Sequence, residues 1–326
     1  MPNRVRMADA GIVVQHDRVA QSNPRELSRA EWELRRATHR ARADAAVGEH
    51  LDRARRGIKH PVEDFLFEYY PLRPGVLRRW YPGLGVRLLD VSEDLAELDL
   101  SDHRREGTTV WADPSVLAHR REGIEWIHTL LSRSADRAPL LGCFGLHEWA
   151  MVHRTSRIRH PQLGLRLSDD EVAGVVEQRG VRCTHYDAYR FFTPTARPLN
   201  ELVLTRTNQA DHDQPGCLHV TMDLYKWAGK LIPLTPSELL LDCFELARDV
   251  RWVDMRASPY DLSSLRDPDA GIRTCRPIRI ETTPGRSEYV AYQREFAERA
   301  APLRRQLLAL VTNILAEPAM QTPPAM

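Results

Sequence analysis

The 326-residue sequence lacks most of the features that assign a chain to a familiar class. Its five cysteines lie 26 to 40 residues apart and form no CxxC pair, which excludes zinc-ribbon and thioredoxin-like motifs. GxGxxG, Walker A and GxSxG motifs are missing, and so are internal repeats. No run approaches the ~18 apolar residues of a membrane span, and the N-terminus carries no apolar signal segment. These absences predict a cytoplasmic protein with reduced cysteines and no membrane partner.

An excess of charge of one sign is also missing. The formal net charge is +1, which gives no indication of a polyanionic partner. Only residues 1–60 depart from this balance, with 13 Arg and Lys against 8 Asp and Glu. Such a local excess contacts phosphates in some proteins, but it is more often a solvated helix face.

Helix start and stop signals are the main local patterns in the sequence, and they predict a mainly α protein (α+β with a few short strands). Short strands do not alternate regularly with helices, which argues against a doubly wound sheet. We predict a flexible extension over residues 1–25 and a single compact helical catalytic domain over 26–314. A small β insertion is expected near 84–113 and a disordered tail over 315–326.

One helix has the strongest local signals. At Thr235-Pro-Ser-Glu238 a capping box coincides with a proline, so Thr235 is expected to cap the helix and Pro236 to occupy its first position. Its apolar residues recur at helical spacing and predict one core-facing stripe: Leu239, Cys243, Leu246, Val250 and Val253. Residues 194–215 are expected to form a long ordered loop and residues 276–282 an edge strand.

Four segments place histidines and acids among aromatic and apolar residues. They are HPVEDFLF from His60, FGLHEWAMVH from Phe144, THYDAYRFF from Thr184 and CLHVTMDLYKW from Cys217. Burying ionisable groups is costly unless they are paired or bind a metal. Their recurrence predicts one polar site, walled by aromatic side chains, at which several segments converge.

The spacing of these residues limits the chemistry. His147 and His153 are six apart, so the segment is not the HExxH motif of zinc proteases. His219 and Asp223 are four apart on one helix face, which suits either a shared metal or a plain surface hydrogen bond. His60 and Glu63 form a similar pair three apart.

Five strings occur in the order HPVEDFLFEYY, CFGLHEWAMVH, THYDAYRFFTP, QPGCLHVTMDLYKW and SELLLDCFELARDVRWVDMRASPYDL. Over residues 28–312 they resemble an actinobacterial-type bacterial family that is usually labelled 3-methyladenine DNA glycosylase. The resemblance implies a DNA-repair hydrolase that excises an alkylated purine from duplex DNA without a cofactor. Such an enzyme needs an aromatic pocket for the flipped base and a carboxylate that stabilises the oxocarbenium or activates water.

The candidate residues follow from these segments and from the resemblance together. The carboxylates that would be catalytic are Glu148, Asp187 and Asp223. Expected substrate-binding residues are Trp149, Tyr186, Tyr189, Tyr225, Lys226, Trp227, Asp254, Arg256 and Tyr260, and Phe191 is a further aromatic wall.

Two alternatives remain open at this point. In the first, His60, Glu63, His147, His185 and His219 supply ligands for iron, manganese or zinc in an enzyme that acts on a small molecule. In the second, the protein is a non-catalytic binding protein that holds a small anion or nucleotide through Lys226 and Arg256.

Overall fold

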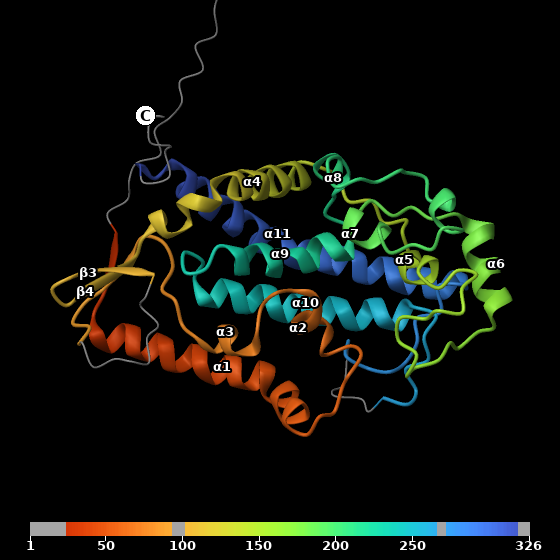
Figure 1. Ribbon diagram of the computed structural model, residues 1–326, viewed down its shortest axis with the longest axis horizontal. Coiled ribbons are helices and arrows are strands. Elements are labelled where there is room, and N and C mark those ends of the chain that lie inside the picture. The colour runs from red at the N-terminus through yellow and green to blue at the C-terminus, as the bar shows by residue number, and fades with distance from the viewer. Residues whose placement is uncertain (1–23, 93–101, 266–271, 319–326) are drawn as a thin grey trace, which may run out of the picture.

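The computed structural model describes residues 24–92, 102–265 and 272–318, and it shows a mainly helical protein with one small sheet (Figure 1). The predicted fold class is therefore confirmed. The ends of the chain, which were predicted to be a flexible extension and a disordered tail, lie largely outside the described residues. None of the described helices is long and apolar enough to cross a membrane.

The core is a bundle of long helices. It contains α1 (Arg29–Arg55), α4 (Arg121–Ala135), α9 (Leu218–Lys230), α10 (Ser237–Ala257) and α11 (Thr283–Ala316). In Figure 1 α9 and α10 run side by side through the middle of the molecule, between α1 and α11. Leucine, valine and aromatic side chains fill the spaces between these helices, and their removal from water drives the packing.

Helix α10 is buried on almost every side, so its predicted apolar stripe is only part of what it buries. All five stripe residues are buried, as expected, but so are Arg251, Asp254 and Arg256. The predicted cap is wrong. Pro236 is the N-cap, and the Thr235 hydroxyl donates instead to the Ala228 carbonyl, 2.8 Å away, at the end of α9.

The sheet has four strands in the order β1-β2-β4-β3. β1 (Arg25–Leu27) pairs in parallel with β2 (Val86–Leu88), while β3 (His103–Glu106) and β4 (Thr109–Ala112) complete it in antiparallel fashion. A separate small core of Leu27, Trp32, Trp80, Leu88, Val91 and Val110 fixes this sheet to the start of α1. The β insertion expected near 84–113 thus pairs with a strand at the boundary between the predicted extension and the predicted domain, and only Arg25 of this strand belongs to the predicted extension.

Short elements connect the bundle and gather at the end opposite the sheet (Figure 1). They include α5 (Leu146–Ala150), α6 (Asp169–Arg179), α7 (Tyr186–Tyr189) and α8 (Gln209–His212). Along the bundle lie α2 (Phe65–Tyr69), α3 (Pro74–Arg78) and the 3-10 segment Pro114–Arg120 that leads into α4.

Two expectations for the connections need correction. The loop expected over 194–215 contains a 3-10 turn (Arg197–Leu199) and α8, because side-chain caps such as that of Asn208 close local turns there. Residues 276–282 form no strand. Instead, the Ile278 amide donates to the Arg256 carbonyl and ties the segment to the end of α10.

Candidate metal centre and cavity

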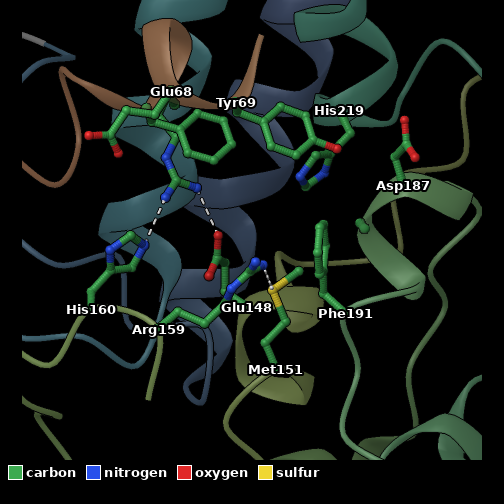
Figure 2. A pocket seen from close by; sticks show the side chains of 12 residues that line it. Glu68, Tyr69, Glu148, Met151, Arg159, His160, Asp187, Phe191 and His219 are labelled. Carbon is green, nitrogen blue, oxygen red and sulfur yellow. Dashed lines mark hydrogen bonds and ion pairs between the residues drawn. The ribbon is translucent and has the colours of Figure 1, made fainter. Parts of the chain in front are cut away.

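A cavity of about 250 Å³ opens where α2, α5, α7, α9 and α10 meet (Figure 2). Its walls combine aromatic rings with ionisable groups. The lining residues are Phe65, Glu68, Tyr69, Glu148, Met151, Arg159, His160, Asp187, Ala188, Phe191, His219 and Arg251.

Three buried side chains form a cluster, which we call the Asp254 cluster, on the inner side of this cavity. His147 comes from α5, His219 from α9 and Asp254 from α10, and one ligand-type atom of each lies within 4.8 Å of the others. His219 lines the cavity, whereas His147 and Asp254 lie behind it.

The contact between His147 and Asp254 is unusual. Nε2 of His147 lies 2.8 Å from Oδ1 of Asp254, an ion pair when His147 is protonated. Both atoms are fully buried, and neither has any other hydrogen-bond partner among the described residues. Their separation also fits a shared metal ion, because ligands about 2.1 Å from one metal ion and roughly at right angles lie about 3 Å apart.

The protonation of the cluster follows from burial and from its one carboxylate. Burial lowers the pKa of His147, but the negative charge of Asp254 outweighs this and raises it above the ordinary value. Burial and the nearby His147 hold the pKa of His219 well below its usual range, so this ring is neutral. Burial opposes ionisation of Asp254, yet His147 and Arg251 keep the pKa of its carboxyl well below normal.

Arg251 holds the remaining carboxylate oxygens. Its guanidinium donates to Oδ2 of Asp254 at 3.0 Å and to Oε1 of Glu148 at 2.7 Å. The same group lies 4.0 Å from the Phe65 ring and 3.4 Å from His160 Nε2 (Figure 2). Burial and the charge of Arg251 lower the pKa of His160 to about 4. A ligand carboxylate that is oriented by a fixed donor is typical of metal sites.

A second buried group of similar composition lies nearby. We call it the Lys226 cluster, and it consists of His185, Asp187, Asp223 and Lys226. The Lys226 ammonium donates to Asp187 at 2.9 Å and to Asp223 at 3.1 Å, and Tyr70 donates to the other oxygen of Asp223. His185 Nδ1 lies 2.9 Å from Asp213. The cation between these carboxylates is therefore a side chain of the protein, Lys226.

Helix α5 begins at a strained turn. Both Phe144 and Gly145 have positive φ, 48° and 70°. A Cβ at Gly145 would lie 3.2 Å from the Tyr289 ring, and the positive φ also disfavours other residues there, so glycine is favoured. Positive φ costs a residue such as phenylalanine conformational energy, and such strain is found preferentially at functional sites. Here the turn places His147 and Glu148, which are adjacent in sequence, in one polar network.

Comparison with protein-family models, with curated proteins and with solved structures finds no match to this chain. The residues of the site itself therefore carry the functional argument.

The structure brings a part of the predicted site together. Glu148 and Asp187, two of the three carboxylates predicted to be catalytic, line the cavity with His219. Asp223 lies behind it and is held by Tyr70 and Lys226. Asp254, predicted to bind substrate, instead stands between His147 and Arg251.

Several predicted site residues have other roles. The Trp149 indole donates to the Ala257 carbonyl, and Tyr225 packs against Tyr70 and Phe244 in the core. Arg256 turns away to the Ile272 and Arg276 carbonyls and to Glu288, so it joins loops rather than lining the cavity. Tyr186, Tyr189 and Trp227 are not among the lining residues, and the Tyr260 hydroxyl accepts from the Arg159 amide.

His60 and Glu63 belong to neither His/carboxylate cluster. His60 Nδ1 accepts from the Val62 and Glu63 amides, and Glu63 accepts from the Trp252 indole at 2.5 Å. The three-residue spacing therefore reflects a local turn. Sequence reasoning missed Arg251, Arg159 and His160. The signal for Arg251 was its position three residues before Asp254 and next to the core-facing Val250 on α10.

Proposed function

We propose that the protein is a metal-dependent enzyme that acts on a small molecule, with His147, His219 and Asp254 as the metal ligands. The observation that carries the proposal is the contact between two fully buried atoms, Nε2 of His147 and Oδ1 of Asp254, which lie 2.8 Å apart and have no other hydrogen-bond partner among the described residues. When His147 is neutral, the buried carboxylate of Asp254 lacks this positive partner, and a bound cation would supply it.

The donor set suits a particular group of metals. Two imidazoles and one carboxylate are the ligands that iron(II), manganese and zinc accept while keeping open positions for substrate or water. A bound ion of this kind supplies Lewis acidity or redox chemistry at the cavity wall. Arg251 would orient Asp254 by holding its second oxygen.

Glu148 has a separate role in the proposal. It is buried and lines the cavity beside the ligands, and one of its oxygens is fixed by Arg251. A carboxylate held at a cavity wall is placed to accept or return a proton during the reaction. His160, which is neutral at pH 7, adds a second proton-transfer group at the same wall.

The test is the metal content of the purified full chain after growth with added iron, manganese and zinc. We expect about one ion per chain, lost in His219→Gln and Asp254→Asn. Asp223→Asn and His185→Gln are matched controls from the Lys226 cluster, and we expect them to keep the ion. Cobalt(II) titration gives a second measurement, since ligand-field bands report imidazole and carboxylate coordination. Folded wild-type protein that takes up none of these ions, or equal loss in Asp254→Asn and Asp223→Asn, would contradict the proposal.

A second candidate is the DNA N-glycosylase activity that the sequence resemblance implies. The aromatic walls of the cavity and the buried Glu148 favour it, because excision needs a stacked base next to a carboxylate. Release of 3-methyladenine from alkylated duplex DNA by chelator-treated protein, reduced by orders of magnitude in Glu148→Gln, would support this candidate over the metal enzyme.

A further inference from the structure

We infer that the cavity binds a small aromatic carboxylate, with its ring against the aromatic walls and its carboxylate on Arg159. The inference rests on the proposed metal-dependent function and names a substrate class for the same site. Three observations carry it: the shape of the walls, the balance of charge around them and the size of the space.

Three aromatic rings line the cavity. Phe65 and Tyr69, one turn apart on α2, stack with ring centroids 5.1 Å apart and planes within 8° of each other. Phe191 stands across from them, edge-on to Tyr69 at 6.5 Å (Figure 2). Arg251 lies over the Phe65 ring, and Arg159 and Arg190 lie over the Phe191 ring. A ligand ring would therefore pack edge-to-face against these walls, an arrangement that favours a planar ring over a bulky aliphatic group.

One cation that lines the cavity, Arg159, has no carboxylate partner among the described residues. The lining carboxylates each contact another basic side chain: Glu68 contacts Lys59, Glu148 shares Arg251 with Asp254, and Asp187 shares Lys226 with Asp223. Arg159 differs, since no ion pair joins it to a carboxylate anywhere in residues 24–92, 102–265 or 272–318. Its guanidinium lies 3.9 Å from the Phe191 ring and 3.6 Å from the Met151 sulfur.

The position of Arg159 and the size of the cavity define the ligand further. A guanidinium is a planar fork that matches a carboxylate with two parallel hydrogen bonds. Because the Arg159 guanidinium lies over Phe191, a ligand ring that packs against the aromatic walls can direct an anionic group toward Arg159. A cavity of about 250 Å³ holds one ring with short substituents and is small for a nucleotide.

Calorimetric titration of the metal-loaded protein with three probes tests the inference. Benzoate carries both features, benzamide has the ring without the charge, and cyclohexanecarboxylate has the charge without the flat ring. We expect benzoate to bind at least about tenfold more tightly than benzamide, the gain of a charge-assisted hydrogen bond. Benzoate should also bind more tightly than cyclohexanecarboxylate, because only its flat ring packs against the aromatic walls. Arg159→Gln should remove that advantage over benzamide and leave benzamide binding unchanged.

The control variant is Arg157→Gln, which should behave as wild type, because Arg157 is exposed like Arg159 but does not line the cavity. Equal affinity for benzoate and benzamide in the wild type, or an undiminished preference in Arg159→Gln, would overturn the inference. Metal content measured on the same samples separates the two ideas. A loaded protein without the benzoate preference refutes only the substrate class, whereas a protein that takes up no metal refutes the proposed function.

Discussion

The Asp254 cluster and the Lys226 cluster both combine histidine with aspartate and share α9, yet their charges are compensated in different ways. In the Lys226 cluster a lysine ammonium bridges Asp187 and Asp223, Arg190 adds a second cation beside Asp187, and a third aspartate holds His185. In the Asp254 cluster the one buried cation, Arg251, is shared between Asp254 and Glu148. One of those two negative charges is left for a protonated His147 or for a metal ion. Composition alone therefore does not distinguish the two clusters; the number and position of the internal cations do.

The largest expected effect comes from removing the internal cation. Lys226→Met leaves Asp187 and Asp223 buried without their shared partner, and breaking a buried ion pair in this way costs about 3–5 kcal/mol. Urea unfolding would measure the loss. Lys230→Met, one turn further along α9 and also over the Trp227 ring, is the matched control and should change stability by about 0.5 kcal/mol or less. Equal losses of stability in the two variants would contradict the role assigned to Lys226.

Metal removal should affect only the Asp254 cluster. A ligand present at 100 times its dissociation constant stabilises the folded state by about 2.7 kcal/mol. We therefore expect a chelator to lower the melting temperature of the wild type and of Asp223→Asn by similar amounts. Asp254→Asn should show no chelator effect. A chelator shift in Asp254→Asn that persists in full would place the ion elsewhere in the protein.

The smallest effect is on acid stability and concerns Asp187. Burial raises the pKa of this carboxyl, but Lys226, His185 and Arg190 outweigh burial and lower it below the ordinary value. Its contribution to stability is complete above the unfolded pKa of about 4 and is lost as pH falls through the lower folded value. One group changes stability by at most about 1.4 kcal/mol per pH unit. Urea midpoints in this acid range should fall less steeply with pH in Asp187→Asn, and parallel curves would contradict the assignment.

The sequence predicted which segments form the site better than it predicted which residues contact one another there. Histidines and acids inside the apolar runs of α5 and α9 had to be buried, which is why they pointed to an internal polar site. The partners could not be predicted, because they depend on how helices pack. Nothing local distinguishes Asp254, next to His147, from Asp223, next to Lys226. His60 and Glu63 misled because a local turn and an indole satisfy them. The cap at Thr235 failed for a related reason, since its hydroxyl serves the preceding helix.

Only one of the three proposed ligands, His219, faces the cavity, and this has a kinetic consequence. Asp254 is fully buried and His147 nearly so, which leaves the cavity side as the accessible approach to the ligand atoms. An ion held there would exchange with solvent through the same space that a substrate fills. A substrate in the cavity would then slow dissociation of the ion. Each release of product would reopen the ion's route to bulk water.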